Sequence, residues 1–515
     1  MDLNVFSARR RVRPHPESVA MPDRRRASEP WILAATILGS SLVFIDGTVV
    51  AIALPVLQGA FGASASSTQW VVEAYTLVLG ALMLLGGALG DRYGRRLLFV
   101  SGVVVFAIGS LLCGISTSMP ALIAARILQG LGGAMLAPAS LALIGACFEG
   151  VDRGKAIGTW SGLTAVASVI GPVAGGVLLD HFGWPSVFFI NVPLAAAVVI
   201  LSLRHVPESR DENERGTPDI VGSALVTAAL AGIVYAFVAS GQGGWSAAGI
   251  AALCAGFAAL GIFVLFESKT PNPILPLGLF ARRDFSGINV MTLLLYGALS
   301  GVMYFLPFVM IQVDGYSATI AGAAFLPFIL LMVVLSRFSG ALAYRVGART
   351  ILVAGPLVTT CGFALLAIFH DLHYWNAIFP SQLLIGTGMG LTVAPLTTTL
   401  FESVPSEHVG LASGINSALS RVAGLLAIAV LGALLSTVFN ASLNQRLTSL
   451  SVRQQADVNA QRAAMAAAHL RDPAEIRPVK AAYLDGFRTV SLACAALTLL
   501  SAAVSGAMLP AKARA

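Results

Sequence analysis

The sequence predicts an all-α polytopic membrane protein with 14 transmembrane helices, and three observations lead to this fold class. The chain has 515 residues, of which 57% are hydrophobic and only 11% are charged, too few to cover a water-exposed surface. Fourteen apolar runs are long enough to cross a bilayer, since a span needs roughly 20 residues. A ten-residue motif, Gly87 to Arg96, recurs in the second half of the chain, which indicates a duplicated membrane unit.

The runs divide the chain into two related parts. Residues 1–30 form an Arg-rich head with several prolines and no apolar core of signal-peptide length, so we expect a disordered cytoplasmic tail. We then expect a six-helix bundle over 31–205, two inserted helices over 206–270, and a second six-helix bundle over 271–510, followed by a short cytoplasmic tail, 511–515. The runs begin near Trp31, Thr68, Leu97, Pro120, Lys155, Ser186, Asp219, Ala247, Phe285, Ser317, Thr350, Asn376, Gly410 and Ala482.

The charge of the loops predicts the orientation. Most Lys and Arg residues of the short loops lie in even-numbered loops, and the short odd-numbered loops contain none. Two places break the pattern: the loop 402–408 lacks Lys and Arg, and the long segment 440–480 contains several. Because long segments follow the positive-inside rule poorly, we retain 14 spans with both termini cytoplasmic. The net charge of +7 is spread over these loops, which indicates membrane topology rather than a nucleic-acid partner.

The long segment has two interpretations. Residues 451–470 are rich in Ala, Gln and Arg, and we expect an amphipathic helix outside the membrane. It either covers the outer mouth of the bundle or serves as a solvated connector.

The internal repeat extends over several motifs. GALGDRYGRR at Gly87–Arg96 returns as GALAYRVGAR at Gly340–Arg349, an offset of 340 − 87 = 253 residues. QGLGGAMLAP at Gln129–Pro138 corresponds to IGTGMGLTVAP at Ile385–Pro395. Runs one to six therefore match runs nine to fourteen, and runs seven and eight are an insertion.

These motifs together resemble the major facilitator superfamily. IDGTVVAIALP in the first run, QWVVEAY in the second and WPSVFFINVP before the sixth are similar to its fourteen-span drug:proton antiporter branch. The resemblance implies two pseudo-symmetric six-helix bundles that alternate access to a central cavity. Two positions depart from the pattern, since Ala51 replaces the usual Asn and Tyr344 replaces the acid of the second turn motif.

Three ionisable residues lie deep in apolar runs, where a charge is costly and needs an explanation. From the rise of a helix, Asp46, Glu73 and Arg126 all lie about 8 to 9 Å below the outer surface, so we expect one shared cluster. Our hypothesis is that Asp46 is the principal proton site, Glu73 its partner or a cation-recognition site, and Arg126 the coupling charge. In the resembling family, Asp46 and Arg126 occupy positions linked to proton coupling. The alternative is a static ion pair that fixes helix packing.

Small residues and a proline mark the fifth run. Proline removes a backbone donor and glycines remove side-chain bulk, so this helix can bend and lie close to a neighbour. The resemblance implies the antiporter motif, in which the bend meets the other half and prevents proton leak; ordinary close packing is the alternative. The residues are Gly162, Gly171, Pro172, Gly175 and Gly176.

The repeated turn carries a second group of candidate residues. An Asp can accept hydrogen bonds from Arg or backbone groups, and the glycines permit a tight turn. By resemblance this cytoplasmic turn is a latch between the second run and the eleventh-run side of the bundle, and it stabilises the outward-facing state. A positive-inside anchor accounts for the arginines but not for the Asp or the glycines. The residues are Gly87, Asp91, Arg92, Gly94, Arg95 and Arg96.

Two other arginines lie inside predicted helices of the second half. Arg421 is roughly 16 Å into the thirteenth run, where internal helix packing is the favoured interpretation. Arg337 lies near a cytoplasmic end and can extend to the surface.

The sequence contains no motif for an enzyme. The five cysteines have no metal or redox spacing, and GxxxxGK[ST] is absent, so we expect no cofactor and a proton gradient as the energy source. We predict proton-coupled efflux of hydrophobic or amphipathic compounds, with two acids against one Arg favouring cations. Export of an endogenous lipid, fatty acid or metabolite is the alternative, and a membrane sensor or scaffold is the least favoured. The expected partners are the lipid bilayer, the substrate and protons. We expect a monomer in the bacterial inner membrane, and a periplasmic adaptor is left open.

Overall fold

The computed structural model consists of long helices that follow the predicted runs. It describes residues 23–210, 219–241, 244–270, 273–369, 373–405 and 408–509, and no strand occurs within these ranges. Among the described residues, fourteen helical segments are long and apolar enough to cross a membrane. The predicted all-α polytopic fold class is confirmed.

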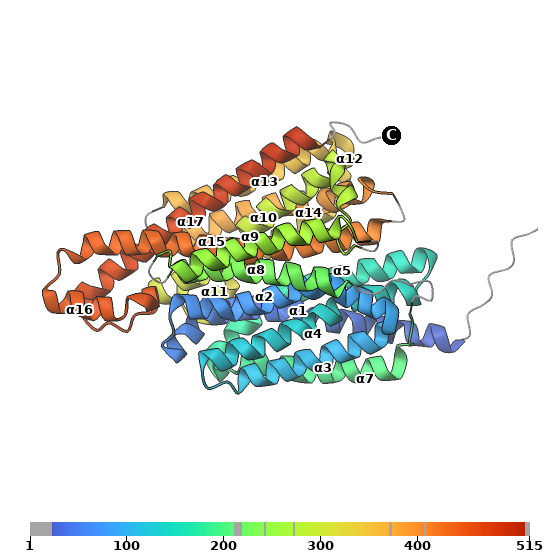
Figure 1. Cartoon of the computed structure of the whole chain (residues 1–515), viewed down its shortest axis with the longest axis horizontal. Coiled ribbons are helices and arrows are strands. Elements are labelled where there is room, and N and C mark those ends of the chain that lie inside the picture. The colour runs from blue at the N-terminus through green and yellow to red at the C-terminus, as the bar shows by residue number, and fades with distance from the viewer. Residues whose placement is uncertain are drawn as a thin grey trace, which may run out of the picture.

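The first half of the chain forms one bundle, in the lower part of Figure 1. The third helix packs against the fourth, the fourth against the second, and the first against the fifth. Its helices are α1 (Asp23–Phe61), α2 (Ala65–Tyr93), α3 (Arg95–Gly114), α4 (Met119–Cys147), α5 (Gly150–Phe182), the short α6 (Ser186–Phe189) and α7 (Asn191–His205).

The last part of the chain forms a second bundle with the same order of spans, in the upper part of Figure 1. Several of its spans are composite, because a short helix or π-helix precedes or follows the main one. The elements are η1 (Leu277–Ala281), α10 (Arg283–Phe308), η2 (Val309–Val313), α11 (Ala318–Ala323), α12 (Leu326–Val346), α13 (Ala348–Ile368), η3 (Tyr374–Ile378), α14 (Phe379–Glu402), α15 (Val409–Leu447), α16 (Val452–Ala460), η5 (Arg462–Ala467) and α17 (Pro473–Met508).

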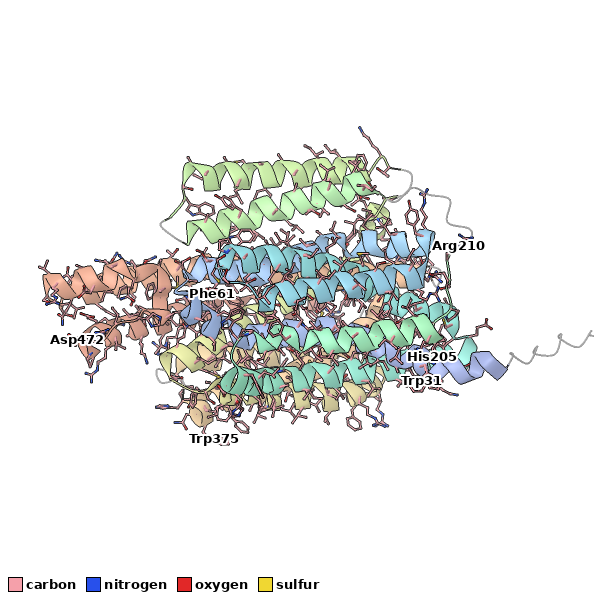
Figure 2. The ribbon with its side chains drawn as sticks, turned by 90° about the horizontal axis from the view of Figure 1, so that it is seen from below. Trp31, Phe61, His205, Arg210, Trp375 and Asp472 are labelled. Carbon is pink, nitrogen blue, oxygen red and sulfur yellow. The ribbon has the colours of Figure 1, made fainter. Side chains whose placement is uncertain are left out.

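The two helices between the bundles, α8 (Ile220–Ser240) and α9 (Ala247–Glu267), form a pair on one side of the molecule. Figure 2 shows this pair as a separate layer, and α8 packs against both α2 and α15. Only 17% of the most apolar window of α9 is buried, with Ile250, Phe257 and Leu265 exposed. This exposure suits a helix that faces lipid.

Serine caps start many of the spans at one end of the molecule. The side chains of Ser64, Ser118, Ser246 and Ser317 each accept a hydrogen bond from a backbone N–H in the first turn of α2, α4, α9 and α11. Such caps satisfy donors that a helix start leaves unpaired. We call this end the Phe61 end. The opposite end, where His205 and Arg210 also lie, is the Trp31 end (Figure 2).

Two predicted boundaries are wrong. Helix α1 begins at Asp23, so residues 23–30 are helical rather than part of a disordered tail, while residues 1–22 and the predicted tail 511–515 lie outside the described residues. The predicted external segment, 440–480, is also shorter. Helix α15 continues to Leu447 and α17 starts at Pro473, because polar residues at the ends of both helices extend beyond the membrane as helix (Figure 1).

The segment between these helices is only partly helical. A capping box at Ser451 and Gln454 starts α16, which ends after nine residues, where the side chain of Gln461 bonds to the backbone of His469. Met465 has a positive φ of 51° and is buried against the bundle. The single amphipathic helix predicted for 451–470 is therefore wrong, because these local and tertiary contacts break it.

Candidate functional site

A fully buried ion pair joins α1 and α4. Arg126 Nη1 lies 2.7 Å from Asp46 Oδ2, and the two side chains are 1% and 0% exposed. The depth arithmetic placed both residues at one level, and the structure brings them into contact. A pair this buried is stable only when hydrogen bonds satisfy its remaining donors and acceptors.

Polar side chains from two helices satisfy the Asp46 carboxylate. Gln129 Nε2 donates to Asp46 Oδ1 at 2.7 Å and to Ser110 Oγ at 2.8 Å. Asn191 Nδ2 lies 3.3 Å from the same Asp46 oxygen and 3.3 Å from Ser110 Oγ. Gln129 also accepts a 2.6 Å hydrogen bond from Arg126 through its Oε1. The Asp46 charge is therefore surrounded by donors from α4 and α7.

Helix α2 completes the surroundings of Arg126. Arg126 Nε donates to the carbonyl of Val71 at 2.9 Å, and its guanidinium carbon lies 4.1 Å from the centre of the Tyr75 ring. A guanidinium over an aromatic ring is held by a cation–π interaction. The charge on α4 is thus in direct contact with the backbone and a side chain of α2.

Glu73 lies outside this cluster, so the predicted three-residue cluster is wrong. Its Oε1 accepts a 3.3 Å hydrogen bond from Gln69, and its buried Oε2 has no hydrogen-bond partner. Consecutive helical residues are rotated by about 100°, so residues two apart point in nearly opposite directions. Because Tyr75 stacks on Arg126, Glu73 must point away from that arginine.

The side of α2 that carries Glu73 meets the second bundle. Gln69, one turn before Glu73, donates to the carbonyl of Ile428 on α15 at 3.1 Å. The structure therefore places the two acids on different sides of α2: Asp46 of α1 lies inside the first bundle, and Glu73 lies at the junction between the bundles.

The glycine- and proline-containing stretch of α5, predicted as the antiporter motif, contacts the second bundle at the Phe61 end. A Cβ added to Gly322 of α11 would lie 2.1 Å from the carbonyl oxygen of Pro172, and one added to Gly176 would lie 2.4 Å from the carbonyl oxygen of Ala318. Backbones this close tolerate no side chain between them. Gly171 and Gly175 make similar contacts with Thr48 and Val49 of α1.

Three glycines in the Trp31 half of α5 have no such contacts with the described residues. Around Gly154, Gly158 and Gly162 an added Cβ would meet nothing within 4 Å, and the same holds for Gly340 on α12. Gly162, predicted as part of the motif, therefore lies away from the close contact. The close backbone contacts between α5 and the second bundle thus lie at the Phe61 end, whereas these glycines of α5 and α12 toward the Trp31 end face open space.

The repeated turn has hydrogen bonds within the first bundle. Arg95 Nε lies 2.8 Å from Asp91 Oδ1, and the Glu208 carboxylate accepts hydrogen bonds from the backbone of Arg96 and Leu97. Gly94 has a φ of 128°, and a Cβ there would lie 2.8 Å from Glu208. The latch to the second bundle stays a prediction, because these contacts join the turn to a residue that follows α7.

A cavity of about 320 Å³ lies between the bundles at the Phe61 end. Residues from α2, α10, α15 and α17 line it, and the segment after α16 covers it. The first bundle contributes Gln58 and Gln69, and the second contributes Tyr304, Phe308, Tyr483 and Arg462. The cavity thus reaches the Gln69 side chain that bonds to Glu73.

Sequence reasoning missed the supporting residues of the ion pair. Gln129 and Asn191 lie within motifs of the resembling family but received no role. A usable signal existed for Gln129, since it follows Arg126 by three residues and therefore shares its helix face. For Asn191 the only signal was an amide side chain next to an apolar run.

Two helical bundles of the same span order, one of which encloses a buried ion pair, with close contact between α5 and α11 at one end and open space beside α5 and α12 toward the other, define an integral membrane transporter. A model of the Major Facilitator Superfamily matches residues 36–428, more than half of the chain, so the chain belongs to this superfamily.

Two relatives and one solved structure extend the comparison. The chain is 34% identical to Multidrug resistance protein Stp of Mycobacterium tuberculosis over 417 residues, covering 81% of this chain and 77% of that protein. It is 32% identical to Multidrug efflux pump LfrA of Mycolicibacterium smegmatis, covering 94% and 97%. Its fold matches the crystal structure of a bacterial homologue of the human lysosomal transporter Spinster, in an inward-facing and unoccupied conformation, with a TM-score of 0.67, 18% identity, and 93% and 96% coverage.

Proposed function

We propose that this chain exports hydrophobic or amphipathic compounds, including cationic drugs, in exchange for protons. The names of its relatives, a multidrug resistance protein and a multidrug efflux pump, support the substrate class. The buried Asp46–Arg126 pair is the observation that carries the proton-coupled mechanism, because its charge balance changes when Asp46 takes up a proton.

Arg126 transmits that change to α2. Protonation of Asp46 removes the counter-charge of a fully buried arginine, whose remaining partners are the Val71 carbonyl, Gln129 and the Tyr75 ring. Val71 and Tyr75 belong to α2, and α2 is bonded to the second bundle through Gln69 and Ile428. A proton on Asp46 therefore favours a new position of α2 against α15.

Glu73 supplies a second site for positive charge. Burial without a cation favours the uncharged form of a carboxyl group, and the Oε2 of Glu73 has no donor. A proton or the cationic group of a substrate neutralises the same carboxylate. Competition between them at Glu73 is a direct way to exchange one for the other.

The orientation follows from the loop charges. The Trp31 end, which carries the arginines of the repeated turn, faces the cytoplasm by the positive-inside rule. The open space beside the glycines of α5 and α12 then lies toward the cytoplasm, as an exporter that loads its substrate requires. The proton gradient across the plasma membrane is the energy source, at about 2.3 kcal/mol per charge per 100 mV.

Inside-out vesicles test this function directly. Accumulation of ethidium and other fluorescent lipophilic cations is measured while a proton gradient is imposed and then collapsed. We expect gradient-dependent accumulation in the wild type, its loss in Asp46→Asn, and a reduction in Glu73→Gln. Asp152→Asn is the matched control, since Asp152 lies in an exposed ion pair with Lys155. Intact transport in Asp46→Asn would show that the proton site lies elsewhere.

A wild-type protein that transports none of the cations would indicate a different class of substrate. If the folded wild type moves no cation under a gradient, export of an endogenous lipid, fatty acid or metabolite replaces drug efflux as the better function. The same vesicles then report on candidate anions and neutral lipids.

A further inference from the structure

The cavity between the bundles at the Phe61 end contains polar groups that the proposed mechanism does not use. Its volume of about 320 Å³ lies in the range of sites for small organic molecules. Helix α10 provides an aromatic wall, because the rings of Phe305 and Phe308 lie 4.7 Å and 5.5 Å from the ring of Tyr304. The inserted helix α8 adds Val238 to the lining, and η5 adds Met465. An aromatic molecule fits walls of this kind.

Two tyrosine hydroxyls in this cavity lack a hydrogen bond. Tyr304 of α10 and Tyr483 of α17 line the cavity and are only 5% and 3% exposed. Neither hydroxyl bonds to a described residue, yet neither is fully enclosed by protein atoms. The small exposed part of each side chain therefore includes its hydroxyl, and that hydroxyl faces the cavity. Buried tyrosine hydroxyls usually have a partner, so these two indicate a polar ligand.

A side chain of the first bundle supplies an acceptor to the same cavity. Gln69 Nε2 donates to Glu73 and to the Ile428 carbonyl, whereas Gln69 Oε1 accepts no hydrogen bond from the described residues. A Cβ on Gly432 of α15 would lie 2.8 Å from that Oε1, so the missing side chain leaves room for the amide. Glu73 itself does not line the cavity. The Gln69 amide thus stands between the cavity and this acid.

Among the described residues that line the cavity, only Arg462 of η5 carries a charge. It donates to Asn440 Oδ1 at 2.8 Å, to Asn459 Oδ1 at 3.3 Å and to Asn444 Oδ1. Amide oxygens accept hydrogen bonds but carry no negative charge, and no described Asp or Glu forms an ion pair with this arginine. The cavity therefore carries a positive charge, which disfavours a cation and favours an uncharged or acidic molecule.

We propose that this cavity binds an aromatic molecule with hydroxyl and carbonyl groups that is uncharged or acidic, and not a cation. The hydroxyls of Tyr304 and Tyr483 and the oxygen of Gln69 bind its polar groups, and the aromatic wall of α10 packs against its rings. Arg462 binds an acidic group where one is present. The external location of the site rests on the orientation in the proposed function, although binding itself is measured without transport.

Three coumarins with the same ring system test the site. The purified protein in phosphatidylcholine nanodiscs is titrated with 7-hydroxy-4-methylcoumarin, with its 7-methoxy analogue or with 7-hydroxycoumarin-3-carboxylate. The pH keeps the phenol uncharged, and binding is measured by equilibrium dialysis. We expect saturable binding of both hydroxycoumarins and binding of the methoxy analogue that is a few-fold weaker, because it cannot donate to Gln69. Ethidium, a cation, should not compete.

Substitutions in the cavity assign the contacts. Tyr304→Phe and Tyr483→Phe each remove one hydroxyl and keep the ring, and each should weaken both hydroxycoumarins a few-fold. Arg462→Gln should weaken only the carboxylate, by about tenfold, and Arg462→Lys should retain part of its affinity.

The controls separate the site from general charge and from folding. Tyr296→Phe changes a tyrosine of α10 that does not line the cavity, and Arg446→Gln changes an arginine that pairs with Asp485. Both should bind the coumarins like the wild type. Thermal unfolding reports on folding, and if one of the two cavity tyrosine variants does not fold, the other decides the question.

Cysteine protection locates the bound molecule and the side from which it enters. Ala433→Cys in the cavity wall and Ala441→Cys, which is exposed outside the cavity, are labelled with a thiol reagent in a cysteine-free background. In right-side-out vesicles the external carboxylate should slow labelling of the first and not of the second. Protection in inside-out vesicles alone would overturn the external location.

Three outcomes would overturn the proposal: no saturable binding of either hydroxycoumarin, unchanged affinity in the folded tyrosine variants, or competition by ethidium. Cation transport in vesicles is scored separately. Gradient-driven transport without hydroxycoumarin binding refutes only this site, whereas hydroxycoumarin binding without cation transport refutes only the efflux of cations.

Discussion

Asp180, near the end of α5, accepts a 2.6 Å hydrogen bond from the hydroxyl of Thr319 at the start of α11. The same carboxylate accepts hydrogen bonds from the backbone N–H groups of Thr319 at 2.9 Å and Ala318 at 3.2 Å. A carboxylate of the first bundle thus satisfies the free donors at the start of a helix in the second. It joins the bundles at the Phe61 end, beside the contact between Pro172 and Gly322.

Replacing this carboxylate should weaken closure at the Phe61 end. Asp180→Ala removes three hydrogen bonds that exist only while the bundles touch, and we expect about a tenfold shift toward opening at this end. The measurement is labelling of Phe308→Cys, in the cavity, by a membrane-impermeant thiol reagent in a cysteine-free background. Asp472→Ala, which removes a cap at the same end within one bundle, is the control. Equal labelling of both variants would contradict this role.

The close backbone contact between α5 and α11 should limit the leak of protons through the protein. Gly322→Ala places a methyl group against the Pro172 carbonyl, so the bundles must separate, and we expect faster proton leak into proteoliposomes without substrate. Gly162→Ala is the matched control because open space surrounds that residue, and it should leave the leak unchanged. A leak of the same size in both variants would favour a general effect on α5 over the antiporter contact.

A double-mutant cycle separates proton coupling from a static ion pair. Arg126→Gln leaves Asp46 buried without its cation and should lower the free energy of unfolding by about 3 to 5 kcal/mol. Asp46→Asn combined with Arg126→Gln removes both charges, so thermal stability should largely return while proton-driven transport does not. If the double variant recovers both stability and transport, the pair serves packing alone.

Gln58 should help to hold the segment between α15 and α17, residues 448–472, against the bundle. Gln58 Nε2 donates to the carbonyl of Ala464 at 3.0 Å, and Gln58 Oε1 accepts a hydrogen bond from Gln312. Gln58→Ala therefore loosens the cover of the cavity, and proteolysis within 448–472 should become several-fold faster, as expected from a loss of about 1 kcal/mol. Gln445→Ala is the comparison, because the Gln445 side chain is exposed. Unchanged cleavage would mean that other contacts hold the segment.

The depth of a charged residue in its span could be predicted from the sequence, but the direction of its side chain could not. Counting residues from the ends of the spans placed Asp46 and Arg126 at one level, and they touch although they are 80 residues apart. The same arithmetic placed Glu73 at that level. Its side chain nevertheless faces the second bundle, because the rotation of α2 is set by Tyr75 on one side and by Gln69 on the other.

Contacts between helices far apart in the chain were likewise outside the reach of sequence patterns. Asp180 and Glu208 are ordinary acids near the ends of spans, and neither stands in a spacing that suggests a partner. Their roles depend on which helix start lies opposite, α11 for Asp180 and α3 for Glu208. Arg421 stood out by depth, but only the arrangement of α2 and α15 shows that it is unpaired.

The sequence by itself determined the number of spans, the duplication and the level of each buried charge. These follow from local properties, since the thickness of a bilayer sets how many apolar residues a span needs. The tertiary structure alone decided which face of each helix meets which neighbour, where α16 ends and which end of the bundle is closed. Those outcomes depend on packing and hydrogen bonds between residues far apart in the chain, which no local pattern encodes.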